Sequence, residues 1–286
     1  MFAETAKTKH LIALLIIIPA FAIAGCAALQ PPDANGPRSN APPYPISLVD
    51  TSARLEEASV AWFQISQHYG LTGKTEASLN PFTGTIESLP PNAGPIVLPK
   101  VGDQDPPAEE QIRESLRRFI VEWRQLIGAD PNQLSLVERT DEASGIKIAR
   151  YEQKPFRYPL RGDFGKLVIR FRPDRQVVSI MSNCIPNADR LQASVAGLTP
   201  KITAEEAVDH VRKQTLVAPG SSGQQQTLTL PANAALTARE LVVYALPAAD
   251  QAGGLQLHLA WAIEVTNGPV KMVYLDAMSD QVLVVV

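Results

Sequence analysis

The chain contains few of the residues from which catalytic and metal sites are built. Its 286 residues include four histidines and two cysteines, and the histidines at positions 10, 68, 210 and 258 are isolated from one another. The sequence lacks the His-Glu-x-x-His motif that sets two imidazoles on one zinc ion. It also lacks a Gly-x-Ser-x-Gly turn, a phosphate-binding loop and a paired-cysteine zinc motif. We therefore predict a protein that is not an enzyme and binds neither a metal ion nor a cofactor.

Individual polar residues also give little indication of a catalytic site. His210 follows Asp209 in a predicted helix and could serve as a general base, but we favour a surface histidine beside a carboxylate. The acidic residues 141 and 142, and Asp276, are interpreted as turn residues. The formal net charge of −3 provides no basic surface, so nucleic acid is not expected as a partner.

The first 25 residues have the pattern of an export signal. Lys7 and Lys9 precede an apolar run at residues 11–24, which is too short for a comfortable membrane span, and Ile23-Ala24-Gly25-Cys26 closes it. This ending resembles the lipobox of bacterial lipoproteins, and the resemblance implies cleavage before Cys26 and acylation of Cys26. The alternative is an ordinary signal peptide or anchor in which Cys26 is incidental.

Lipidation of Cys26 implies a location in the cell envelope. Each buried methylene contributes about 0.8 kcal/mol, so two or three acyl chains would hold the protein on a membrane essentially permanently. Ala27 is compatible with sorting to the outer membrane if the host has two membranes. Residues 26–45, rich in proline, alanine, asparagine and glycine, are predicted to form a disordered tether between the lipid and the fold.

With Cys26 acylated, Cys184 has no partner for a disulfide bond within the chain. A redox or nucleophilic role is one interpretation of Cys184. The interpretation that we favour is a small buried core residue, because Cys184 shares a strand face with Val178 and Ile180 in the predicted pattern.

Residues 46–99 are predicted to be a strand-rich segment. Residues 61–69, which include Trp62 and Phe63, favour a strand slightly, and a helix over residues 51–65 is the alternative. Asn80-Pro81-Phe82-Thr83-Gly84-Thr85 predicts a turn before a short strand at residues 85–89. A second linker then runs to residue 107.

The next element is an amphipathic helix. Asp105 and Pro106 suit its N-cap and first turn, and Gly128 suits its end. Its arginine-rich face is either a docking surface or a solvated helix face, and we favour the second. The apolar stripe consists of Ile112, Leu116, Phe119, Ile120, Trp123 and Ile127.

Alternation of apolar and polar residues predicts most of the strands. Leu167, Ile169 and Phe171 alternate with charged residues, and the turn Arg172-Pro173-Asp174-Arg175 predicts an antiparallel hairpin with the next strand. A helix is predicted at residues 204–215, with capping-box spacing at its start, and a long loop at residues 217–235. The strands are expected at residues 134–138, 146–153, 165–172, 176–185, 239–246, 255–266, 270–276 and 281–286.

A helix followed by antiparallel strands therefore occurs twice along the chain. This order predicts an α+β fold with two units, each a helix packed on an antiparallel sheet. The last strand, Val282 to Val286, could be an exposed edge that adds a strand from a partner, but we favour an interior strand.

Six short motifs stand out in the second half of the chain. They are Tyr151-Glu152-Gln153, Tyr158-Pro159-Leu160-Arg161-Gly162-Asp163, Gly165-Lys166-Leu167-Val168-Ile169, Thr199-Pro200-Lys201-Ile202-Thr203-Ala204-Glu205-Glu206-Ala207, Leu259-Ala260-Trp261-Ala262-Ile263-Glu264-Val265 and Tyr274-Leu275-Asp276-Ala277. These motifs resemble those of the FTP domain, a fungalysin/thermolysin-type propeptide module, and of the PepSY domain that follows it. The resemblance runs from about Pro106 to Val286, and it departs from the family pattern at Asp163 and at Ser279-Asp280. It implies an FTP-like unit at residues 105–190 and a PepSY-like, cystatin-like unit at residues 199–286.

In that family these modules assist the folding of a metallopeptidase and inhibit it, and they act through protein surfaces. No peptidase motif accompanies them in this sequence. The resemblance therefore implies a non-enzymatic, membrane-anchored envelope lipoprotein that binds a protein partner and inhibits or chaperones a secreted metallopeptidase. The alternative is a structural scaffold or assembly lipoprotein that binds exported polypeptides.

Overall fold

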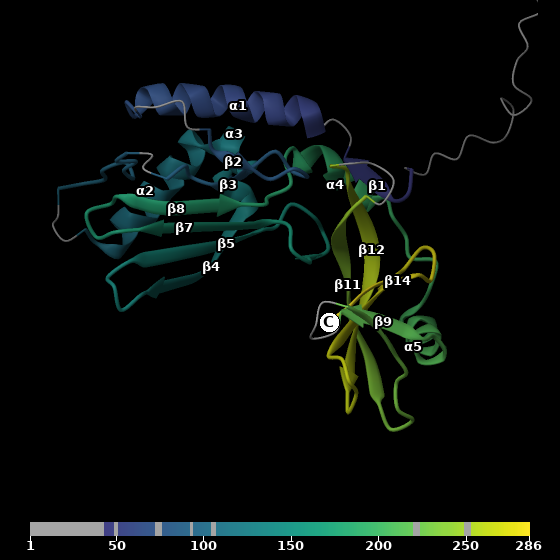
Figure 1. The fold of residues 1–286 in the computed structure, drawn as a ribbon. Helices are drawn as coiled ribbons and strands as arrows, with labels where there is room; N and C mark the ends of the chain where they lie inside the picture. The colour runs from purple at the N-terminus through teal and green to yellow at the C-terminus, as the bar shows by residue number, and fades with distance from the viewer. Residues whose placement is uncertain are drawn as a thin grey trace, which may run out of the picture. The chain divides into compact units, whose positions relative to one another are not determined.

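A computed structural model describes residues 43–48, 51–71, 76–91, 94–103, 107–219, 224–248 and 253–286 (Figure 1). The predicted signal segment, Cys26 and Asp105 lie outside these residues. No helix within the described ranges is long and apolar enough to cross a membrane.

Four antiparallel strands form a sheet in the FTP-like stretch of the sequence. They are β4 (Leu134–Asp141), β5 (Lys147–Gln153), β7 (Lys166–Phe171) and β8 (Val177–Ser182), and they pair in the order β4-β5-β7-β8. All four strands were predicted, and the hairpin between β7 and β8 is confirmed. Its turn is closed by the Arg175 amide, which donates to the Arg172 carbonyl over 2.9 Å.

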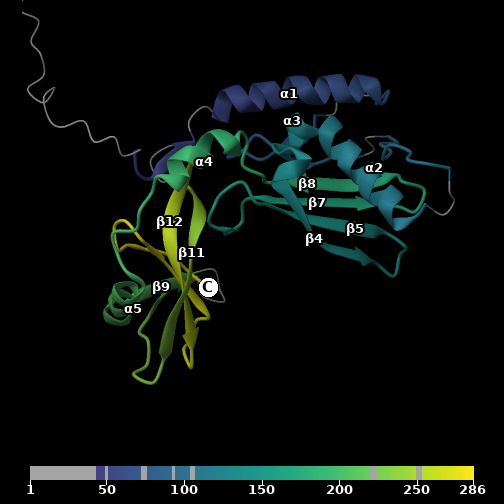
Figure 2. The same ribbon diagram turned by 180° about the vertical axis from the view of Figure 1, so that it is seen from behind.

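The predicted amphipathic helix covers one face of this sheet. It is divided into α2 (Glu109–Glu122) and α3 (Arg124–Ile127), and it is followed by a short 3-10 turn, η1 (Pro131–Gln133). Gly128 ends α3 in the left-handed conformation, with φ of 80°, as predicted. The helix begins later than expected, because its N-cap residue is Ala108. In Figure 1 the four strands lie in front of α2, and in Figure 2, seen from behind, α2 lies in front of the strands.

The slight preference for a strand at residues 61–69 is wrong. Residues Thr51–His68 form helix α1, so the alternative is confirmed, and its length exceeds that of every strand in the supposedly strand-rich segment. The helix forms because Ala58, Ala61, Trp62 and Ile65 share one buried face, whereas Phe63 is exposed. The strands of this segment are short: β1 (Ile46–Leu48), β2 (Ser78–Leu79) and β3 (Ile86–Ser88).

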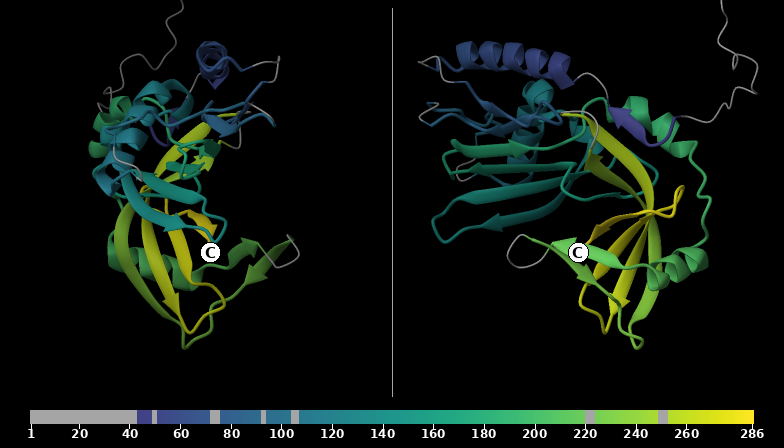
Figure 3. Two further views of the ribbon diagram at one scale, coloured as in Figure 1. Left: turned by 90° about the vertical axis from the view of Figure 1, so that its left-hand side faces the viewer. Right: turned by 45° about the vertical axis from the view of Figure 1, so that its right-hand side comes forward.

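A second sheet forms in the PepSY-like stretch (Figure 3). Its long strands are β11 (Ala235–Pro247), β12 (Leu255–Thr266), β13 (Met272–Asp276) and β14 (Val282–Val285), with β6 (Leu160–Arg161) next to β11. The order is β14-β13-β12-β11-β6, and β1 pairs with β12. Because β14 ends this order, the preference for an interior last strand is wrong. On the sheet's helical side, however, Val285 of β14 packs in one cluster with Leu216 and Ala218.

Helix α5 (Ala204–Lys213) lies on one face of this second sheet and buries Ala207 and Val211 there. The predicted capping box is confirmed. The Glu206 amide donates to Thr203 Oγ1 over 3.2 Å, and the Thr203 amide donates to the Glu206 carboxylate over 2.8 Å.

Two features were not predicted. Helix α4 (Ala188–Ala196) follows the four-stranded sheet, and its buried Ala188 and Val195 pack in one cluster with residues 255–259 of β12. The expected loop at residues 217–235 instead contains two short strands, because β9 (Leu216–Pro219) pairs with β10 (Gln225–Leu228), and β11 begins at Ala235. The α+β class is thus confirmed, while the unit boundaries and the PepSY and FTP assignments remain predictions. Strands β1 and β6 join the second sheet from outside residues 199–286.

Candidate functional site

The cysteine and histidine residues that the sequence offered as candidate site residues do not form one site in the described part of the chain. Cys26 lies outside the described residues. Cys184 is fully buried, which confirms the core interpretation, and burial raises the pKa of its thiol to about 12. A thiol in this state is a poor nucleophile at neutral pH.

The three histidines of the described residues lie on three different elements. His68 on α1 lies 3.7 Å from Glu122, and His210 on α5 lies 3.3 Å from Asp280 rather than against its sequence neighbour Asp209. His258 lies on β12. Within the part of the chain that the structure describes, no three His, Cys, Asp or Glu side chains are grouped so that they could hold a metal ion.

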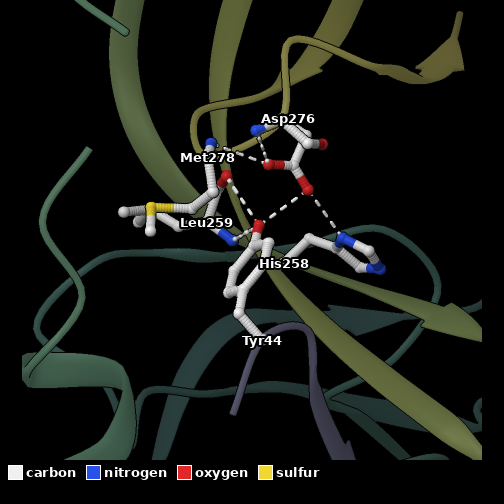
Figure 4. Close-up of polar contacts among 6 residues, drawn as sticks. Tyr44, His258, Leu259, Asp276 and Met278 are labelled. Carbon is white, nitrogen blue, oxygen red and sulfur yellow. Dashed lines mark hydrogen bonds and ion pairs between the residues drawn. The ribbon is translucent and has the colours of Figure 1, made fainter. Parts of the chain in front are cut away.

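His258 belongs to a cluster of ionisable side chains around the buried Asp276, together with Tyr44. The His258 Nδ1 atom lies 2.8 Å from Asp276 Oδ2, and the Tyr44 hydroxyl donates to the same oxygen over 2.7 Å. Figure 4 shows both side chains converging on this carboxylate. Its other oxygen accepts from the amides of Met278 (2.7 Å) and Ser279 (3.0 Å). The Asp276 side chain is 1% exposed, and four donors surround it.

The strand register explains why these residues meet. Asp276 lies opposite Ala260 in the β12–β13 ladder, and His258 is two residues from Ala260 on the same face. Strand β1 pairs with β12 at residues 255–257, and β13 pairs with it at residues 260–264, so Leu259 falls between the two partners. There the Leu259 amide donates to the Tyr44 hydroxyl over 3.2 Å. Tyr44 thus replaces a missing strand partner and holds β1 next to the end of β13.

This contact corrects two predictions. Tyr44 and Pro45 were assigned to the disordered tether, yet Tyr44 is bonded to a residue at the far end of the chain. The interpretation of Asp276 as a turn residue describes only one of its two oxygens. The sequence did contain a signal, since His258 occupies a polar position in a strand that alternates over twelve residues. Only the register, however, shows which carboxylate faces it.

The contacts within this cluster shift the pKa values of Asp276 and Tyr44. Burial by itself raises the pKa of Asp276, but hydrogen bonds from His258, Tyr44 and the Met278 amide outweigh it and hold the pKa below its ordinary value. Burial and the bond to Asp276 raise the pKa of Tyr44 well above that of a free phenol. At neutral pH the cluster is therefore an Asp carboxylate that accepts from a neutral tyrosine.

A carboxylate beside an imidazole can orient a general base. Because Nδ1 faces Asp276, it donates its proton there, and Nε2 becomes the basic nitrogen, directed away from the carboxylate in Figure 4. Nucleophilic catalysis also needs a hydroxyl or thiol within reach of that nitrogen. The hydroxyl of this cluster, Tyr44, bonds the carboxylate instead. The arrangement is therefore suited to holding strands together.

The motif residues of the FTP-like stretch also make structural contacts. The Gln153 side chain is buried and bonds both polar groups of the Ile185 backbone, at 2.9 Å and 2.8 Å. Gly165 has φ of 78°, and a Cβ atom there would lie 2.3 Å from Leu160 Cδ2. Thr85, which precedes this stretch and lies in the predicted turn before β3, is buried as well and donates to the Ser182 carbonyl over 2.7 Å. These residues connect loops to the sheet.

The second sheet has an apolar surface on the face away from α5. We call it the strand-only cluster, because all of its residues come from β11 to β14. Tyr244 and Tyr274 lie at its centre with ring centroids 4.5 Å apart. His258 is on the same face, opposite Tyr244 in the ladder. The buried members are Val242, Tyr244, Ala260 and Ala262, and the half-buried members are Leu246, Met272, Tyr274, Leu283 and Val284.

Comparisons with models of known protein families and with curated protein sequences find no match to this chain. The FTP and PepSY resemblance therefore stays a prediction. The strand-only cluster was not predicted either. The alternation of β12 placed its large apolar residues on one face, and it gave no weight to Ala260 and Ala262 on the other.

Proposed function

We propose that the protein is a lipid-anchored envelope protein that binds a protein partner through the strand-only cluster and acts by binding rather than by chemistry. The partner that the FTP and PepSY resemblance suggests is an exported metallopeptidase, which this protein would inhibit or chaperone. The lipobox-like sequence at Cys26 supports the anchor.

The observation that carries the proposal is the apolar character of a sheet face to which no helix contributes within the described residues. Five of the nine side chains of the strand-only cluster are only half buried, and they include a methionine and a tyrosine. Tyrosine and methionine are enriched at protein interfaces. Apolar area there contributes roughly 25 cal/mol per Å² when a partner removes it from water.

Polar groups lie beside this apolar surface. Arg161 and Glu240 form an ion pair of 2.7 Å between β6 and β11. Burial raises the pKa of both cluster tyrosines, so their hydroxyls remain neutral hydrogen-bond donors. An apolar centre with polar groups nearby is the common arrangement of protein interfaces.

The test is site-specific photo-crosslinking in membranes of the native host. A benzophenone amino acid replaces Tyr274 in the full-length chain, and the matched control carries it at Met181, which is 44% exposed on the four-stranded sheet. We expect Tyr274 to capture one exported protein that Met181 does not capture. Equal capture at both positions, or capture at Met181 alone, would refute the assignment to the strand-only cluster.

A second measurement tests the identity of the partner. If mass spectrometry identifies the captured protein as a metallopeptidase, the purified chain should lower its activity or raise its refolding yield. A Met272→Gln variant should do so less well. Capture of envelope assembly proteins without a peptidase supports the scaffold alternative instead, which the open edge of β4 also favours.

The anchor is tested separately. Cys26→Ser should move the protein from the membrane fraction to the soluble fraction, because the acyl chains are lost. Retention of the variant in the membrane would contradict the lipoprotein assignment, whatever the crosslinks show.

A further inference from the structure

The two edges of the four-stranded sheet differ in what lies beside them. Next to β8, the Val177 amide donates to the Ile96 carbonyl over 2.8 Å, and Val97 forms a bridge with Gln176. On the opposite side, β4 pairs with β5 and, among the described residues, with no other strand. The outer backbone groups of β4 are therefore the sheet's open edge.

A groove lies between this open edge and helix α2. It has a volume of about 320 Å³. Leu134 and Leu136 of β4 and Tyr151 of β5 form its apolar floor, and Ile120 of α2 and Pro131 of η1 contribute further apolar surface. Leu134 and Leu136 are only half buried. A strand added to β4 would place alternate side chains on this floor.

The groove is positively charged. Its polar side chains of α2 are Arg113 and Arg117, and no carboxylate lines it. Arg117 is held by Glu114 at 2.7 Å. Arg113 is held more loosely, since its nearest carboxylates, Glu109 and Glu110, lie at 3.6 Å and 4.0 Å. The Arg113 guanidinium can therefore turn towards a ligand carboxylate at little cost.

We propose that this groove binds an extended, acidic segment of an exported polypeptide, which pairs with β4 as a fifth strand and places a carboxylate on Arg113. The open edge supplies the main-chain hydrogen bonds, the leucine floor takes one or two apolar side chains, and the arginine selects the charge. This binding does not involve the strand-only cluster. It can therefore be confirmed or refuted independently of the partner binding proposed for that cluster.

The edge also limits the length of the segment. The ladder between β4 and β5 has a bulge between Leu136 and Glu138, and Val137 is 48% exposed there. A bulge bends an edge strand and interrupts its pairing. Beyond it, Arg139 is bonded to Glu109. The added strand is therefore short and pairs mainly beside Leu134–Leu136, which disfavours unlimited edge-to-edge aggregation.

The experiment uses the full lipidated chain in phosphatidylcholine nanodiscs, with empty nanodiscs as the blank. The probe is a fluorescein-labelled peptide, Leu-Ser-Glu-Ser-Leu-Ser-Glu, which puts leucine and glutamate on one strand face. Binding is followed by fluorescence anisotropy, and protection of residues 134–141 by hydrogen exchange. We expect binding with protection of β4. We expect none for the same peptide with lysine for glutamate, or with proline at its centre, because proline cannot pair as a strand.

Two variants of α2 localise the site. Arg113→Glu should weaken binding of the acidic peptide roughly tenfold, because a carboxylate then faces a carboxylate. Arg118→Glu is the matched control: Arg118 is an exposed arginine of the same helix that does not line the groove, and binding should stay within about twofold. Equal losses in both variants would show only general charge attraction and would overturn the assignment of the site to this groove. Binding without protection of β4, or no binding at all, would overturn the proposal.

Discussion

Each of the two sheets has a helix packed on one face, and the composition of the opposite face differs between the two sheets. On the four-stranded sheet the apolar residues of that face lie opposite arginines: Ile148 pairs with Arg170 and Val168 pairs with Arg150. These arginines are bonded to Glu142 (2.6 Å) and Glu138 (2.8 Å). On the second sheet the corresponding face carries the strand-only cluster, with the tyrosine pair at its centre.

This difference is the reason for which we propose the second face, and not the first, as the partner surface. Long arginine stems can cover apolar neighbours while their charged ends stay in water, so Ile148 and Val168 of the first face lie beside such cover, although Met181 next to Val168 is 44% exposed. On the second sheet, Ala260, Ala262 and Tyr244 are already buried, and the half-buried Met272 and Tyr274 keep apolar area that a partner surface would remove from water.

The largest expected effect is in the core of the four-stranded unit. Trp123 is fully buried, and its ring stacks on Phe119 with centroids 4.9 Å apart. Trp123→Ala should cost about 3–5 kcal/mol of unfolding free energy. Trp261→Ala in the second sheet should cost less, about 2–3 kcal/mol. Trp261 is only half buried, so less apolar area is lost, and the loss of its hydrogen bond to the Ile202 carbonyl adds to that smaller cost. Urea denaturation of both variants measures the order, and a larger loss for Trp261→Ala would contradict it.

The next effect concerns the polar cluster that holds β1 to the second sheet. Asp276→Ala leaves four donors without their acceptor and should cost about 3 kcal/mol. Tyr44→Phe keeps the ring and removes the hydroxyl, so it should cost about 1–2 kcal/mol. Thermal unfolding gives both values. If Asp276→Ala melts like the parent protein, the cluster does not hold the strands together.

The pH dependence has a defined sign. The pKa of Asp276 is lower in the folded protein than in the unfolded chain, so its contribution is fully present above about pH 4 and is lost as the pH falls through the folded value. The pKa of Tyr44 is raised, so its contribution is fully present below about pH 10 and is lost above it. Unfolding between pH 2 and 7 should show a shallower acid loss in Asp276→Asn than in the parent. An equal loss would assign the acid sensitivity to other carboxylates, such as Glu114.

How far the sequence predicts this structure depends on whether a feature is local. The alternation of β12 gave the observed bounds of that strand, 255–266, because the side chains of a half-buried strand repeat every two residues. The capping box of α5 was found for the same reason, since its residues are three apart. Helix α1 was only the alternative prediction because the adjacent aromatic residues Trp62 and Phe63 favour a strand, while burial against the core decides for a helix.

The candidate site could not be predicted in this way. Tyr44 and Asp276 are 232 residues apart, and their contact requires both the pairing of β1 with β12 and that of β13 with β12. The strand-only cluster depends on strand order as well, because Val242, Ala260 and Tyr274 become neighbours only once β11, β12 and β13 are aligned. A pattern within one segment contains neither kind of information.

The smallest effect provides the sharpest test of the comparison. Glu138→Ala removes the exposed ion pair with Arg150 and should cost at most about 0.5–1 kcal/mol, since exposed pairs contribute little. It should leave capture of the partner unchanged. Met272→Gln on the strand-only cluster should cost a similarly small amount, because its side chain is half buried, yet it should lower capture several-fold. Crosslinking yield and melting temperature, measured together, separate the two faces. A loss of capture in Glu138→Ala alone would assign binding to the ion-paired face instead.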